Sequence, residues 1–128
     1  MNDYKMESIE ATIAGLMPGM KKVNITFKII STGEEQSIDS SRAEGTHRVV
    51  DAVVGDSTAT VLMPIWNETI DSVKEGETYT LTNGYTGLFK GSLRLHMGKF
   101  GSIALAEEPI DEINMKLDMS TRDFNSSQ

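Results

Sequence analysis

Apolar and polar residues alternate along several short stretches of this chain, which is typical of half-buried β-strands. The clearest run is 23–29, in which Val23, Ile25, Phe27 and Ile29 share one face of an extended chain. No long stretch repeats with the period of a helix. The pattern predicts about five strands, within the ranges 23–29, 47–54, 58–66, 78–85 and 92–97, and a short final extended segment over 102–106.

Turn residues separate these stretches and predict how the strands connect. Gly55-Asp56 predicts a tight hairpin between 47–54 and 58–66. The range 83–91 (Asn-Gly-Tyr-Thr-Gly-Leu-Phe-Lys-Gly) predicts the tip of a second hairpin. We expect a long polar loop or frayed strand end over 31–45, and one or two helical turns over 67–73.

Few strands, no βαβ rhythm and no repeat favour a small antiparallel barrel, which closes edges that an open sheet would expose. The predicted fold class is therefore all-β, a five-stranded Greek-key OB-fold barrel with a short helical link between strands 3 and 4. We expect an N-terminal extension over 1–12, the OB-fold domain over 13–109 and a short, acidic, flexible C-terminal tail over 110–128.

Strand parity places several functional side chains on the outer face of this barrel. Trp66, the single tryptophan, alternates with the apolar Val61, Met63 and Ile65 and so lies opposite the core. In 92–97, Arg94 and His96 face away from the two leucines. Pro64 has no backbone donor, which indicates an edge or a bulge at that position.

Charge and composition narrow the function classes. The net charge of −7 argues at first against nucleic acid, but residues 107–128 hold six acids and two bases, a net of −4, so residues 1–106 carry only −3. The chain has no cysteine and two histidines, which excludes thiolate zinc sites and histidine-rich metal sites. No arrangement of a nucleophile with a base and no phosphate-binding loop is present, so we expect no enzyme, cofactor or metal.

Aromatic and cationic residues on the predicted outer surface favour a flat, anionic ligand. Trp66, Tyr85 and Phe89 can stack on bases, an interaction worth about 1–3 kcal/mol per base in single-stranded nucleic acid. Five cations are the candidates for phosphate contacts: Lys28, Arg48, Lys90, Arg94 and Lys99. Each ring could instead be ordinary barrel packing, and each cation an ordinary solvated charge.

Four segments together resemble a known family: 16–20 (Leu-Met-Pro-Gly-Met), 51–58 (Asp-Ala-Val-Val-Gly-Asp-Ser-Thr), Trp66 and 83–91. In this order they are similar to the short archaeal and human-type single-stranded-DNA-binding proteins, single OB-folds related to replication protein A. The resemblance covers about residues 13–106. It implies that Trp66, Tyr85 and Phe89 stack on bases, and His96 falls where some relatives carry a further aromatic.

The chain departs from that family at two places. Members often carry a long Gly/Arg-rich or Pro-rich tail with an acidic tip, whereas residues 118–128 are at most a stub of one. The first loop is also unusually acidic for the wall of a binding cleft, with Glu34, Glu35, Asp39 and Glu44.

The leading hypothesis is sequence-independent binding and protection of single-stranded DNA in replication, recombination and repair. An RNA-binding OB module and a protein-binding adaptor, in which the rings anchor an interface, remain the alternatives. The expected partners are single-stranded nucleic acid and replication or repair proteins, with no membrane, and the protein is expected to be a monomer. Residues 1–10 lack the pattern of a signal peptide, so we expect a cytoplasmic location, nucleoid-associated in a prokaryote.

Overall fold

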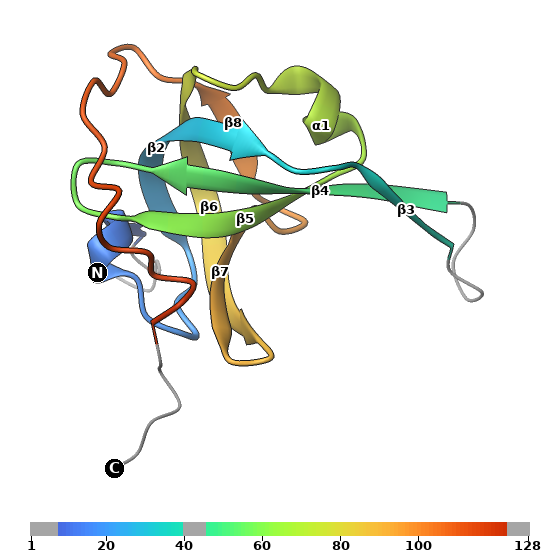
Figure 1. Cartoon of the computed structure of the whole chain (residues 1–128), viewed down its shortest axis with the longest axis horizontal. Helices are drawn as coiled ribbons and strands as arrows, with labels where there is room; N and C mark the ends of the chain where they lie inside the picture. Colours follow the sequence, from blue (N-terminus) through green and yellow to red (C-terminus); the bar gives the residue numbers. More distant parts are fainter. Residues whose placement is uncertain (1–7, 40–45, 123–128) are drawn as a thin grey trace, which may run out of the picture.

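The computed structural model describes residues 8–39 and 46–122 of the chain. Within them strands dominate, and the helical pieces are short (Figure 1). The elements in chain order are β1 (Ile9–Glu10), the 3₁₀ helix η1 (Ile13–Gly15), β2 (Val23–Thr32), β3 (Gln36–Asp39), β4 (Thr46–Gly55), β5 (Thr60–Trp66), α1 (Glu68–Ser72), β6 (Thr78–Phe89), β7 (Ser92–His96) and β8 (Ser102–Leu105).

Five of the strands close into a ring. Each strand pairs with the next in the order β2-β4-β5-β7-β6, and β6 pairs again with β2. β2 closes the ring because its first part, 23–28, pairs with β6, while Lys28 and the residues after it pair with β4. In chain order α1 lies between β5 and β6, the third and fourth strands of the ring, so this is the predicted OB-fold.

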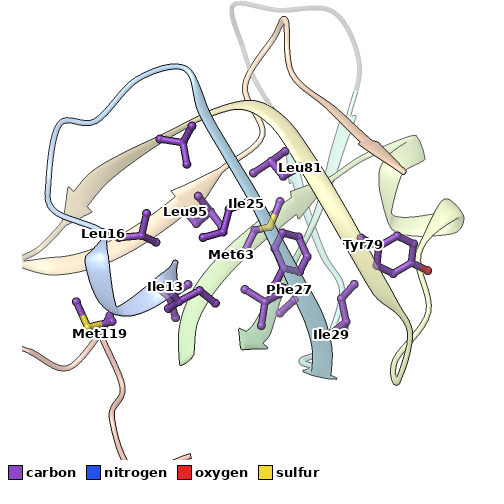
Figure 2. Packing of buried hydrophobic residues seen from close by; sticks show 14 of the residues in the cluster. Ile13, Leu16, Ile25, Phe27, Ile29, Met63, Tyr79, Leu81, Leu95 and Met119 are labelled. Atoms are coloured by element: carbon purple, nitrogen blue, oxygen red, sulfur yellow. The ribbon is translucent and has the colours of Figure 1, made fainter. Parts of the chain in front are cut away.

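The core confirms the alternation that the sequence predicts. The residues of β2 that share one face, Val23, Ile25, Phe27 and Ile29, are all buried, and they meet Met63 and other residues of the strands opposite (Figure 2). Pro64 is tolerated in β5 because β5 pairs with β7 only at Leu62, so no ladder on that side requires a donor from Pro64.

Part of the predicted long loop over 31–45 is a strand. β3 pairs antiparallel with the first residues of β4, and the two form an arm that projects from the barrel (Figure 1). This arm forms because β4 begins at Thr46, several residues before it meets β5 at Val49. The polar composition of 36–39 gave no sign of this strand, because a strand that covers little of the core does not need alternating apolar residues.

The predicted hairpin between 78–85 and 92–97 is present, but its tip is much shorter than the predicted 83–91. β6 runs on to Phe89, and the turn consists of Lys90 and Gly91, whose φ angles of 52° and 82° fit a two-residue hairpin loop. Asn83, with φ 61°, instead marks an irregularity within β6, where the pairing with β2 shifts register. Glycine follows it because a Cβ on Gly84 would lie 2.9 Å from the carbonyl oxygen of His96.

The expectation of a flexible tail over 110–128 is also corrected for the residues described, 110–122. Met119 is fully buried, and its N–H donates to the Thr60 carbonyl at 2.8 Å. The Ser120 hydroxyl donates to the Leu93 carbonyl and accepts the Leu62 N–H at 2.8 Å, so it bridges β5 and β7. The segment follows the side of the barrel (Figure 1), and with β1 paired to β2 the packed unit extends beyond 13–109 at both ends.

We predict that Met119→Ala lowers the free energy of unfolding by about 2–5 kcal/mol, because it leaves a cavity under the docked segment. Met115→Ala is the matched control, since Met115 is 60% exposed, and its effect should stay within about 0.5 kcal/mol. Urea unfolding followed by circular dichroism measures both. Equal, small effects would show that the segment does not pack on the barrel in solution.

Candidate nucleic-acid interface

Trp66 ends β5 on the outer face of the barrel. Its neighbour Ile65 points into the core, so Trp66 points outward, with 44% of its surface exposed. Asn67, at φ 52°, then turns the chain into α1, and its side-chain oxygen accepts the N–H of Arg48 at 2.9 Å. Trp66 therefore lies where β5 gives way to α1, with its side chain on the outer face that parity predicts.

Tyr85 and His96 form a stacked pair next to Trp66. They face each other in the β6–β7 ladder, with ring centroids 4.8 Å apart and planes 18° from parallel. A Cβ at Gly98 would lie 3.0 Å from the Tyr85 ring, so glycine leaves room for the pair. His96 thus contacts the aromatic cluster, as the sequence suggests.

The environment of His96 favours its neutral form. Burial lowers the pKa of the imidazole below its usual 6.5, and the positive charge of Arg94 lowers it further. An uncharged imidazole stacked on a phenol ring presents a flat, weakly polar surface near neutral pH. That surface suits a base better than it suits a phosphate.

Phe89 lies at the end of β6 beside two cations. The Lys90 ammonium lies 5.4 Å and the Arg94 guanidinium carbon 5.2 Å from the ring centroid, within the range of cation–π attraction. Phe89 nevertheless keeps 56% of its surface exposed. The hairpin end therefore combines an accessible ring with two charges that could contact a phosphate.

Two adjoining clefts bring these side chains together. The first, of about 240 Å³, we call the stacking cleft; its walls include Trp66, Tyr85 and His96. The second, of about 360 Å³, we call the arm cleft; it runs from β3 to Phe89 and Arg94. Because Pro64, Trp66 and His96 line both, the two clefts form one continuous apolar groove across the barrel.

Arg48, a predicted phosphate ligand, is already engaged. Its guanidinium donates to Asp71 at 2.7 Å and to Glu35 at 3.5 Å, and it also donates to the Asn67 carbonyl at 3.0 Å. The hydrogen bond between Arg48 and Asp71 raises the pKa of the Arg48 guanidinium and lowers the pKa of the Asp71 carboxyl. The structure thus gives Arg48 a place in holding α1 and the arm together beside Trp66.

Lys28 and Lys99 lie apart from the groove and from each other. Lys28 pairs with Gly55, six residues along β4 from the Val49 that faces Trp66, a separation of about 20 Å on one strand. Its position gives the predicted phosphate role no support. Lys99 lies in the turn after β7, on the far side of Tyr85 and next to Gly98 of the stacking cleft.

Several groove residues were not predicted as part of a site; the acidic Asp51 is one, and the apolar Pro64 and Ile38 are two others. Pro64 shares the outward parity of Trp66, a signal that was present in the sequence but was interpreted only as a break in the ladder. Ile38, 43% exposed on β3, lines the arm cleft, but its polar surroundings gave no sign of a strand. The groove is therefore more apolar than the sequence indicated.

Other kinds of site find no counterpart in the residues described. Residues 8–39 and 46–122 hold no cluster of three or more histidine or acidic side chains placed to bind a metal ion. Nor does any helix in those ranges have the length and apolar character needed to cross a membrane.

The fold and the groove define a small OB-fold protein with an aromatic groove on its outer face. Residues 16–105 match the family model described as single-stranded DNA binding protein Ssb-like, OB fold. The chain is 32% identical over 100 residues to the single-stranded DNA binding protein Ssb of Saccharolobus solfataricus, covering 78% of this chain and 66%, just under two thirds, of that protein. The chain therefore belongs to the Ssb-like family of single-stranded-DNA-binding OB-fold proteins.

Solved structures agree with this assignment at the level of the fold. A hypothetical protein from Arabidopsis thaliana superposes with a TM-score of 0.78 at 24% identity, covering 100% of this chain and 94% of that one. The second OB-fold domain of replication protein A from Methanococcus maripaludis gives a TM-score of 0.62 at 18% identity, covering 80% and 100%. The predicted likeness to archaeal Ssb and to replication protein A is confirmed.

We predict that the His96 ring titrates below pH 6.5 in the folded protein, as followed by NMR of its ring protons. Since the unfolded chain then binds a proton more readily, stability is retained above pH 6.5 and falls as the pH drops towards the folded pKa. Arg94→Gln should raise the pKa only in part, because burial is the larger cause. A pKa at or above 6.5 in the unaltered protein would contradict the geometry.

Proposed function

We propose that this protein binds single-stranded DNA without strong sequence preference, by stacking bases on Trp66, Tyr85, Phe89 and the Tyr85-paired His96. The observation that carries the proposal is the continuous groove in which these rings lie together. Aromatic faces accept any base, since every base has a π-face, and this makes binding tolerant of sequence. The family of the chain supports the same ligand class.

Phosphate contacts in this proposal come from Lys90 and Arg94, with Lys99 at the far side of Tyr85. Lys90 and Arg94 lie beside Phe89, where a strand stacked on the ring would bring its backbone close. Arg48 acts differently: through Asp71 and Asn67 it positions the helix that follows Trp66. With few free cations, stacking contributes more than charge does.

Protection of single-stranded DNA in replication, recombination and repair is the process that such binding would serve. Coating of exposed strands needs affinity without sequence readout, and the groove offers ring faces and few hydrogen-bonding side chains. We propose no catalytic step.

Fluorescence of Trp66 tests the binding directly, because it is the single tryptophan of the chain. Saturating oligo-dT should quench its emission. Tyr85→Ala and Phe89→Ala should each weaken binding by roughly 5- to 150-fold, corresponding to about 1–3 kcal/mol for one stacked base. Tyr85→Phe keeps the ring and should retain the affinity.

Leu105→Ala is the control for loss of an exposed apolar side chain, since Leu105 is 65% exposed on β8 and outside the groove. Its affinity should equal that of the unaltered protein. If oligo-dT leaves the emission of Trp66 unchanged at low salt, the proposed function is wrong. A clear preference for oligo-U over matched oligo-dT would make RNA the ligand.

Salt dependence gives a second prediction. With Lys90, Arg94 and Lys99 as phosphate contacts, log K against log salt should have a slope near −2, using about 0.7 per contact for single strands. Lys90→Gln should make that slope shallower by about 0.7, whereas Lys116→Gln, on the docked C-terminal segment, should not change it. A slope near zero in the unaltered protein would exclude these phosphate contacts while leaving stacking intact.

A further inference from the structure

A third cleft, of about 320 Å³, lies beyond Tyr85, and apart from Tyr85 itself the function proposed above uses only its Lys99. We call it the basic cleft; its walls include Lys21, Lys22, Asn83, Tyr85, Lys99 and Phe100. Tyr85 and Gly98 also line the stacking cleft, so the two clefts meet across the Tyr85 ring. A chain lying in one can pass directly into the other.

The turn between β7 and β8 presents Phe100 to solvent. Gly98 has φ 79°, and a Cβ at Gly101 would collide with the Met97 carbonyl, so both glycines are needed for this turn. The Asn83 side chain donates to the Phe100 carbonyl at 3.3 Å and ties the turn to β6. The Phe100 side chain is left 79% exposed, more than any other large apolar residue that the structure describes.

A single exposed apolar side chain is common on a protein surface, so the case for Phe100 depends on the turn and the cations around it. Phe100 does not belong to the buried core, and the Lys99 ammonium lies 5.5 Å from the centroid of its ring. A ring held on a tied turn beside a cation matches the arrangement of Phe89 with Lys90 and Arg94. Both are suited to a base stacked on the ring with a phosphate nearby.

Charge distinguishes the two ends of the groove. The basic cleft has three ammonium groups in its walls and no carboxylate, and Lys21, Lys22 and Lys99 make no ion pair with any residue the structure describes. At the opposite end, Asp51 lines the arm cleft, and Glu34 and Asp51 line a small cleft at the base of the arm. A polyanion is attracted to the first end and repelled by the second.

We propose that a single strand in the stacking cleft continues over Tyr85 into the basic cleft, where a base stacks on Phe100 and Lys21, Lys22 and Lys99 contact its phosphates. This extension rests on the function proposed above and assigns the strand a path away from the acidic arm. It adds Phe100 to the stacking rings of the groove, Trp66, Tyr85, His96 and Phe89. It also makes the binding site longer than the groove alone.

Oligonucleotide length separates the extension from the groove. An oligo-dT of about four nucleotides can fill the groove alone, whereas one of about twelve can reach both clefts, within the usual range of 4–16 nucleotides per OB-fold. Phe100→Ala should weaken binding of the longer oligonucleotide by roughly 5- to 150-fold and leave the affinity for the shorter one unchanged. Leu105→Ala is the matched control and should affect neither.

The cations give an independent readout. Lys21→Gln should make the salt slope for the longer oligonucleotide shallower by about 0.7 and leave the slope for the shorter one unchanged. Lys116→Gln, which also removes one positive charge, should change neither slope. These variants alter exposed or half-exposed side chains outside the core, so folding is not at risk.

The outcomes distinguish this extension from the function on which it rests. If Phe100→Ala weakens both lengths equally, or weakens neither, the extension is overturned while the quenching of Trp66 still supports the groove. If neither oligonucleotide quenches Trp66 in the unaltered protein, the proposed function fails and the extension fails with it. The continuous path is supported if Phe100→Ala lowers the affinity, and Lys21→Gln makes the salt slope shallower, for the longer oligonucleotide alone.

Discussion

The closure of the ring by β2 is the constraint on which the other features depend. β2 pairs with β6 along its first part and with β4 along its second. These two pairings fix the register of β2, β4 and β6 relative to one another. Alternate residues are then divided between a sealed interior and an outer surface. Phe27 and Leu81 fill the interior, while Trp66, Tyr85 and Arg94 are forced outward. The aromatic groove is thus the outer surface of the same alternation that forms the core.

Polar groups that pair far along the chain hold the remaining segments on this ring. The Asp56 carboxylate, only 8% exposed, accepts the N–H of Ile13 at 3.0 Å and the N–H and hydroxyl of Thr58. It therefore joins η1 to the β4–β5 turn and has its hydrogen-bonding capacity satisfied. Thr86 similarly accepts the Met20 N–H at 2.9 Å and donates to the Met17 carbonyl, and Ser120 ties the C-terminal segment to β5 and β7. These few side-chain hydrogen bonds are enough to hold the segments on the ring, because each one satisfies a backbone group that would otherwise be buried without a partner.

The net charge of −7 conceals an uneven surface. Several acids lie where they hold structure: Asp71 and Glu35 pair with Arg48, and Glu75 accepts the Thr32 N–H at 2.8 Å. Lys21, Lys22 and Lys99, by contrast, lie together with no carboxylate in the same cleft. A nucleic-acid ligand responds to this local field more than to the total, since salt screens charges beyond about 10 Å. In the function that we propose, the rings supply the contact area, and a few unpaired cations contact phosphates.

The sequence by itself determined those features of the fold that depend on residues close together along the chain. The two-residue period of a strand assigned the core face of β2 and β5 and the outward direction of Trp66, Arg94 and His96, and tight turns marked most connections. Tertiary structure alone decided the rest. Asn83-Gly84 is an irregularity in a long strand because β2 and His96 pack against it, and Met119 is buried because β5 and β7 offer partners to its backbone. Arg48 was predicted as a free cation and Lys21 was not considered. The charge partners of a side chain are set by residues far away in the sequence, and only the folded chain brings them within reach.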